Sequence, residues 1–157
     1  MSVDLRVRHQ IPAPADEVWR VLVDWAGQRR WIPFTTVRVL TDRDTGLGVR
    51  CEALSGFWLG RWSIGLLDRF VVTGWRPPSG VANGVLEVLH TGPFFTGPGV
   101  FELRPLGEKL TEIRCAEIFD VVGGALPTRV ARLGLPVMRM MFSATLRKLG
   151  QVTLAGR

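Results

Sequence analysis

The chain contains no tyrosine, and only two cysteines and two histidines among its 157 residues. Without tyrosine, no phenolic hydroxyl is available for acid–base chemistry. Cys51 and Cys115 stand alone, with no CxxC pair and no spacing to the histidines that would suit a metal ion. We therefore expect no metal site, and we interpret both cysteines as buried free thiols of a protein in a reducing cytoplasm.

Long apolar stretches and blocks of charge are also missing. No segment reaches the ~18 apolar residues of a membrane span, and the N-terminal stretch MSVDLRVRHQ lacks the apolar core of a signal peptide. The formal net charge is +6, but Arg29–Arg30 and Arg147–Lys148 are the only adjacent basic pairs. These features predict a cytoplasmic protein without a nucleic-acid partner, and they leave weak contact with an anionic membrane as an alternative.

Recognisable catalytic motifs are absent as well. The chain has no nucleophile elbow, no Ser/His/Asp arrangement and no glycine-rich phosphate loop. No cofactor is therefore expected, and the sequence favours a binding protein over an enzyme. An enzyme of the cyclase type is the alternative, because a cyclase needs little more than a shaped cavity.

What the chain does contain is an ordered series of hydrophobic patterns. Residues 3–11 alternate apolar and polar, which predicts a strand, and residues 15–25 and 28–32 have the spacing of two short helices. Six further alternating segments follow, and their short connections indicate an antiparallel meander. After Gly123–Gly124 the period returns to that of a helix, which Pro136 is expected to kink. The six strands are predicted at 35–42, 48–55, 65–75, 82–91, 99–106 and 110–120.

Length and pattern together predict one α+β domain over residues 1–157. Seven antiparallel strands form a sheet with one apolar face to bury. The long C-terminal helix is the only element large enough to cover that face. The expected architecture is therefore a curved sheet against this helix, with two short helices after the first strand.

Four stretches of the chain resemble those of a known family. IPAPADEVWRVLVDW is similar to its first strand and helix, WIPF to the tryptophan–proline that follows, DRFVVTGWRPP to its fourth strand and double-proline turn, and GVFELRPLG with TEIRCAEI to its C-terminal third. On these stretches the chain resembles the START-type helix-grip (SRPBCC) superfamily, and within it the polyketide cyclase/dehydrase-like group. The resemblance implies a seven-stranded sheet wrapped around the C-terminal helix, with a cavity for lipids, polyketides or other hydrophobic molecules. The fold alone does not choose among these ligands.

Alternation within the strands predicts which side chains face the helix. We expect Arg69, His90 and Glu117 to point inward, each from a different strand. Counting from the turns places these three in one row across the sheet, with Gly99 opening a space in the row. Arg69 could then touch His90, whereas Glu117 would lie ~10 Å from His90, two strand spacings away.

This placement makes His90 and Glu117 candidate catalytic residues. An inward carboxylate must be paired, hydrated or protonated, because a lone buried charge is very costly. Three interpretations of the row stay open: a polar anchor for a ligand head group, an acid–base pair, or an ion pair with a purely structural role in the core. The predicted ligand-binding residues are Arg69, Val71, Trp75, Val88, His90, Phe101, Cys115, Glu117, Val137, Met138 and Met141.

The segment TGPFFTGPG, residues 91–99, is predicted to be a loop because glycine and proline punctuate it. Its two phenylalanines are unusual for a surface loop. In the meander it meets GFWLGRW and the start of the long helix at one end of the sheet. We expect the apolar lips of a gated pocket there, with a plug of the sheet end or a membrane-dipping tip as alternatives. The predicted mouth residues are Phe57, Trp58, Trp62, Phe94, Phe95 and Leu126.

One function is favoured by these features and two others stay open. The leading hypothesis is a protein that binds a hydrophobic or amphipathic small molecule between the sheet and the C-terminal helix. The first alternative is a polyketide cyclase or aromatase that uses the same cavity. The second is a peripheral lipid-transfer protein, which predicts that basic charge gathers around the pocket mouth.

Overall fold

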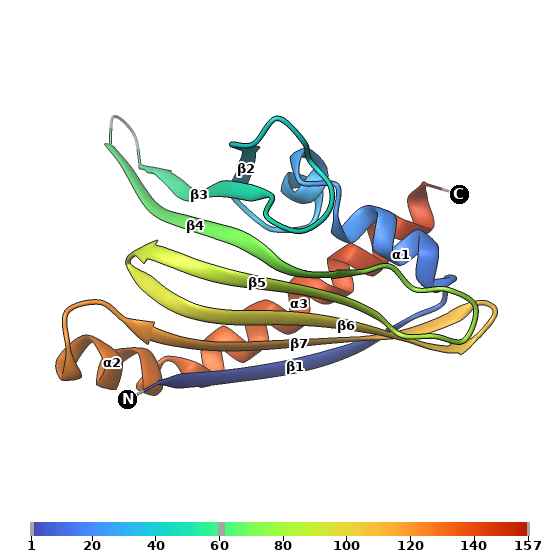
Figure 1. Cartoon of the computed structure of the whole chain (residues 1–157). Helices are drawn as coiled ribbons and strands as arrows, with labels where there is room; N and C mark the ends of the chain where they lie inside the picture. The colour runs from blue at the N-terminus through green and yellow to red at the C-terminus, as the bar shows by residue number, and fades with distance from the viewer. Residues whose placement is uncertain (1, 60–61, 157) are drawn as a thin grey trace.

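A computed structural model describes residues 2–59 and 62–156. For residues 57–59 and 62–64 it describes the backbone alone. Seven antiparallel strands form one curved sheet in the order β1-β7-β6-β5-β4-β3-β2 (Figure 1). The predicted seven-stranded α+β architecture is therefore confirmed. The strands are β1 (Val3–Ile11), β2 (Thr35–Val39), β3 (Arg50–Leu59), β4 (Trp62–Arg76), β5 (Gly84–Pro93), β6 (Phe95–Gly107) and β7 (Leu110–Val121).

The helices lie on one face of this sheet, which we call the inner face. Helix α1 (Ala15–Leu22) and the short helix η1 (Ala26–Arg30) follow β1, as predicted, and α3 (Leu135–Ala155) crosses behind the strands in Figure 1. Leu146 and Leu149 of α3 are fully buried in one core with Trp19 and Leu22 of α1. None of the described helices combines the length and apolar character needed to cross a membrane.

The long C-terminal helix is divided where proline requires it. The chain forms α2 (Ala125–Leu133), a single turn residue at Gly134, and then α3, whose first turn contains Pro136. Proline lacks the amide that an interior helical position would donate, so the first turn of a new helix is its natural place. The predicted kink at Pro136 is therefore a break two residues earlier.

An irregularity in β4 overturns part of the predicted facing. The pairing with β5 shifts between Val72 and Gly74, which indicates a β-bulge. Phe70 and Val72 before the bulge and Trp75 after it therefore all reach the core. Strict alternation would put Trp75 on the opposite side from Phe70, so the prediction that Arg69 and Val71 point inward with Trp75 was wrong for the first two.

The segment TGPFFTGPG is not a loop. Strand β5 continues to Pro93 and β6 begins at Phe95, so Phe94 alone lies between the two strands. Thr91 pairs with Thr96 across this turn. The glycine at position 97 has φ +142, and a Cβ there would overlap the carbonyl oxygen of Ile118 on β7. Glycine here allows close strand approach rather than a flexible hinge.

Candidate functional site

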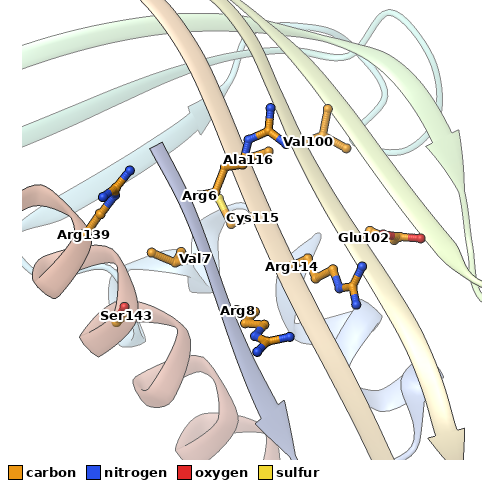
Figure 2. A pocket seen from close by; sticks show the side chains of 10 residues that line it. All are labelled: Arg6, Val7, Arg8, Val100, Glu102, Arg114, Cys115, Ala116, Arg139 and Ser143. Carbon is orange, nitrogen blue, oxygen red and sulfur yellow. The ribbon is translucent and has the colours of Figure 1, made fainter. Parts of the chain in front are cut away.

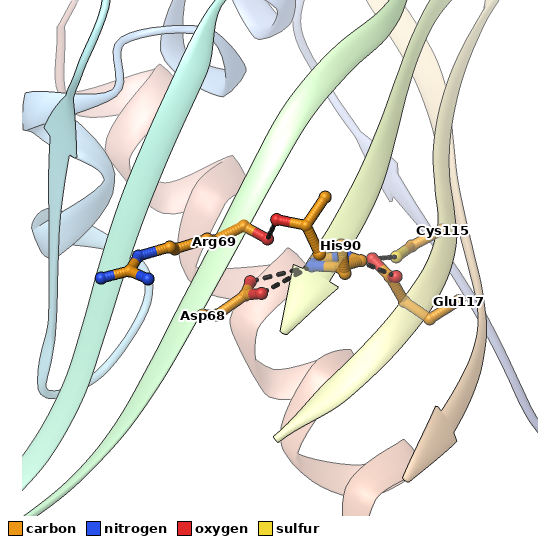
Figure 3. Close-up of polar contacts among 6 residues, drawn as sticks. Asp68, Arg69, His90, Cys115 and Glu117 are labelled. Atoms are coloured by element: carbon orange, nitrogen blue, oxygen red, sulfur yellow. Dashed lines mark hydrogen bonds and ion pairs between the residues drawn. The ribbon is translucent and has the colours of Figure 1, made fainter. Parts of the chain in front are cut away.

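A cluster of three ionisable side chains lies on the inner face, contributed by β4, β5 and β7. Nδ1 of His90 lies 2.8 Å from Oδ2 and 3.0 Å from Oδ1 of Asp68. On the other side of the ring, Nε2 lies 3.1 Å from Oε2 of Glu117. Figure 3 shows the imidazole held between the two carboxylates. We call these three residues the Asp68–His90–Glu117 cluster.

The contact between His90 and Glu117 is closer than predicted, and glycines in β6 explain why. Gly99, which was expected to open a space in the row, pairs with Glu117, and His90 pairs with Gly97. The β5–β6 turn is tighter than assumed. Because Gly99 has no side chain, the Glu117 carboxylate lies over it and reaches His90 across β6; a Cβ there would lie 2.5 Å from Oε2 of Glu117.

The cluster is almost withdrawn from solvent. The side chains of Asp68, His90 and Glu117 are 15%, 11% and 9% exposed. Burial by itself would lower the pKa of His90, but the hydrogen bonds to Asp68 and Glu117 and their negative charge outweigh burial and raise this pKa from 6.5 to about 9. His90 is therefore an imidazolium at neutral pH, and both of its N–H groups donate to carboxylates.

Glu117 keeps acceptor capacity that the protein itself hardly uses. Its Oε1 accepts a weak bond from the Cys115 thiol, with Sγ at 3.9 Å. Burial, and after it the charge of Glu117, raises the pKa of that thiol well above its usual range, so Cys115 stays protonated. Within the described residues, no group of three His, Cys, Asp or Glu side chains is arranged to hold a metal ion.

Aromatic rings surround the imidazole. The ring of His90 lies 5.1 Å from that of Phe95 and 6.0 Å from that of Phe70, measured between centroids. Phe95 in turn lies 5.6 Å from Phe119 of β7. Adjacent residues therefore have opposite environments at this turn, since Phe95 covers the cluster while Phe94 points outward and is exposed.

The other predicted mouth residues lie around the same end of the sheet. Leu126, at the start of α2, is exposed, and the amide of Val122 donates to the carbonyl of Phe94, so the two turns are adjacent. The side chains of Phe57, Trp58 and Trp62 lie outside the described residues.

Sequence reasoning chose Arg69 as the third member of the row, but the structure puts Asp68 there. Arg69 points away from the cluster in Figure 3 and pairs with Glu52 at 2.9 Å, its side chain 55% exposed. Val71 shares that outer face. Asp68 lies two residues before Phe70 on β4 and points to the same side; Phe70 is buried in the structure, but alternation alone does not show that Phe70 and not Arg69 faces inward.

The remaining predicted lining residues are distributed between the core and the surface. Val88 and Cys115 are buried, and Phe101 and Trp75 pack against the core, Trp75 edge-on against Trp19 at 5.2 Å. In α3, by contrast, Met138 is half-buried, and Val137 and Met141 are exposed. The predicted lining is therefore packed on the side toward α1, whereas its members in the first half of α3 are half-buried or exposed.

Two hollows of the surface are not lined by Asp68, His90 or Glu117 themselves, although the larger one reaches Cys115, whose thiol contacts Glu117. One of about 290 Å³ lies over Arg8, His9, Gln10 and Glu112. Another, of about 710 Å³, is formed by α3, β1, β7 and β6 (Figure 2). It shares only Cys115 with the predicted ligand-binding residues, and its four arginines make it polar. It is lined by Arg6, Val7, Arg8, Val100, Glu102, Arg114, Cys115, Ala116, Arg139 and Ser143.

Sheet, helix and cluster together define an α+β protein of the helix-grip class. The chain belongs to the family described as polyketide cyclase/dehydrase and lipid transport, whose model matches residues 2–152. The resemblance seen in the sequence is thus confirmed. Among curated proteins no sequence matches the chain.

Solved structures repeat the fold over nearly the whole length. TTHA0849 from Thermus thermophilus has a TM-score of 0.73 at 17% identity, covering 98% of this chain and 99% of that chain. The Zhui aromatase/cyclase from Streptomyces sp. R1128 has a TM-score of 0.68 at 18% identity, covering 98% and 94%. Norcoclaurine synthase from Thalictrum flavum has a TM-score of 0.63 at 11% identity, covering 100% and 89%. At these identities the likeness establishes the fold alone.

Proposed function

We propose that the chain binds a hydrophobic small molecule between the first half of α3 and the inner face of the sheet, with the Asp68–His90–Glu117 cluster as its polar anchor. The observation that supports this most is a charged cluster that is nearly buried on the inner face of the sheet, the face on which α3 lies. Apolar side chains of α3 that are left exposed would contact the body of the ligand. The cluster would fix its polar end.

The chemistry of the cluster suggests what that polar end is. When both acids are ionised and His90 is protonated, the cluster carries one net negative charge. Both ring nitrogens are engaged, so the atoms available to a ligand are carboxylate oxygens, above all Oε1 of Glu117. These oxygens accept hydrogen bonds, so the proposed ligand carries a donor such as a phenol, an alcohol or an amine.

Native mass spectrometry of the freshly purified protein tests this proposal. We expect a co-purified small molecule on the wild-type chain. Gly99→Ala should weaken its retention, because the new Cβ displaces the Glu117 carboxylate. Gly107→Ala is the matched control on the same strand, since a Cβ at position 107 meets nothing within 4 Å. Equal retention by all three proteins would show that the cluster does not anchor the ligand. An empty protein that binds no hydrophobic probe would refute the proposal.

A second candidate is a cyclase or aromatase that works at the same place. The observation in its favour is a histidine held between two carboxylates in a fold shared with an aromatase/cyclase. The elevated pKa of His90 suits proton donation and not proton abstraction at neutral pH. His90→Gln separates the two functions: a cyclase would lose turnover of a poly-β-ketone while still binding it, whereas for a binding protein wild type and variant would both leave the compound unchanged.

A further inference from the structure

The net charge of the chain is concentrated in one segment. All fourteen acidic residues precede Val121, together with fourteen of the twenty basic residues, so the first 120 residues are neutral as a whole. The segment 121–157 contains no aspartate or glutamate and carries the entire excess of six basic residues. This segment forms α2 and α3.

The same helices expose a continuous row of apolar side chains. Within α2 and within α3 its members are three or four residues apart, the spacing of one helix face, except that Met140 and Met141 are adjacent. They include Leu133, which is 83% exposed, the largest exposure in the row. Phe94 and Val122 at the adjoining turns extend the row toward the cluster end of the sheet. We call it the apolar stripe: Leu126, Val130, Leu133, Val137, Met140 and Met141.

Two basic residues beside the stripe differ from several of those on the sheet. On the sheet, Arg6, Arg69 and Arg114 each have a carboxylate partner within 3 Å. Within the described residues, Arg129 and Arg139 of the helices have no carboxylate at ion-pairing distance. The charge of Arg129 is therefore available to a negatively charged partner, whereas that of Arg139 also acts on Asp4 of β1, whose pKa is lowered by Arg6 and by Arg139.

We propose that the apolar stripe docks onto the surface of an anionic lipid bilayer. A basic helix with one exposed apolar face lies in the bilayer interface, its apolar side chains among the acyl chains and its arginines near anionic head groups. A second copy of the chain fits the face poorly, because symmetric contact would bring two acid-free basic segments together. The stripe shares Val137 and Met141 with the proposed ligand site, but the docking variants fall on Leu126, Arg129 and Leu133 of α2, outside that site. The docking proposal therefore does not require a ligand.

Vesicle cosedimentation with the full-length chain tests the docking. We expect the wild type to bind vesicles of equimolar phosphatidylcholine and phosphatidylserine at least about tenfold more tightly than vesicles of phosphatidylcholine alone. Raising the salt from about 0.1 M to about 1 M should remove most of that preference, because it shortens the screening length.

Matched variants separate the two parts of the surface. Leu126→Ser with Leu133→Ser should weaken binding to the mixed vesicles about tenfold or more, and Arg129→Glu should weaken it to a similar extent. The controls are Val81→Ser, at an almost fully exposed valine of the β4–β5 connection, and Arg29→Glu on η1. Both controls should bind like the wild type. The β4–β5 connection lies at the other end of the sheet from the β5–β6 turn (Figure 1), and η1 is not part of the two helices that carry the stripe.

Three results would overturn the docking proposal. The first is a wild-type chain that binds neither kind of vesicle. The second is equal binding to both kinds with no effect of salt. The third is a dimer in analytical ultracentrifugation that the Leu126→Ser/Leu133→Ser double variant dissociates, since the stripe would then be an interface between copies. All variants fall on exposed side chains, so their far-ultraviolet circular dichroism should match the wild type.

Discussion

The two ends of α3 use similar residues in different ways. Toward the C-terminus, Leu146 and Leu149 are fully buried against β1 and α1, and Gly150 lies so close to Ile11 that a Cβ would be 3.2 Å from it. Toward the N-terminus, Val137 and Met141 are more than half exposed. One end of the helix therefore holds the fold together, while the other leaves its apolar wall free.

Charge follows the same division. On the sheet, Arg114 and Arg104 both lie near Glu112, at 2.6 Å and 3.8 Å. Charged groups toward the open end include the Asp68–His90–Glu117 cluster and, within the described part of the chain, Arg129 and Arg139, which have no carboxylate at ion-pairing distance. Stability should therefore depend on the packed end, and recognition on the open end.

The largest expected effect separates the two ends by stability. Leu149→Ala should lower the free energy of unfolding by about 2–5 kcal/mol, because it leaves a cavity in the core. Met141→Ala should change it by less than about 0.5 kcal/mol, since that side chain is largely exposed. Urea unfolding of both variants measures the difference. Similar losses would show that the first half of α3 is also packed.

The next effect comes from pH. The folded state holds the His90 proton more tightly than the unfolded state, so the stabilisation is complete below pH 6.5 and is lost as pH rises through about 9. The loss should approach roughly 3 kcal/mol, from about 1.4 kcal/mol per pKa unit. Urea unfolding at a series of pH values measures this slope, and His90→Gln should remove most of it. A wild-type profile that is flat between pH 6.5 and 9 would refute the paired imidazolium.

A smaller effect isolates one bond of the cluster. Gly99→Ala displaces the Glu117 carboxylate and should lower the pKa of His90 toward 6.5, with a loss of stability of about 1–2 kcal/mol. Gly107→Ala should leave both quantities unchanged. Titration of the His90 ring protons by NMR gives the pKa of each variant. An unchanged pKa in Gly99→Ala would mean that Glu117 does not need the space over Gly99.

The smallest effect belongs to the residue that the sequence favoured and the structure excluded. Arg69→Ala removes an ion pair on the outer face and should cost less than about 1 kcal/mol, because such pairs are largely solvated. The pKa of His90 should not move. Unfolding in urea and the same NMR titration check both statements. A clear shift in the pKa of His90 would show that Arg69 acts on the cluster after all.

The fold could be predicted from the sequence because its patterns are regular. Alternation in β5 and β7 places His90 and Glu117 on the inner face, and the pairing of Gly99 with Glu117 follows from counting back from a short turn. The bulge after Val72 could not be predicted, because the alternation of residues within β4 does not show where its pairing with β5 shifts. For that reason Arg69 was chosen in place of Asp68.

The division of the C-terminal helix could be predicted only in part. Pro136 indicates an interruption, and the apolar spacing predicts one amphipathic face. Spacing does not reveal which length of that face meets a partner, because burial depends on where β1 and α1 end. Met138 and Met141 therefore looked equivalent in the sequence, and the structure half-buries the first and exposes the second.

The central claim is that the Asp68–His90–Glu117 cluster anchors a hydrophobic ligand through a hydrogen-bond donor. Isothermal titration with 2-naphthol and with 2-methoxynaphthalene, which lacks the donor, tests it most directly. The account predicts that the wild type and Gly107→Ala bind 2-naphthol about tenfold or more tightly than the ether, and that Gly99→Ala loses this preference. Equal affinity for the two compounds in the wild type, or no binding of either, would contradict the claim.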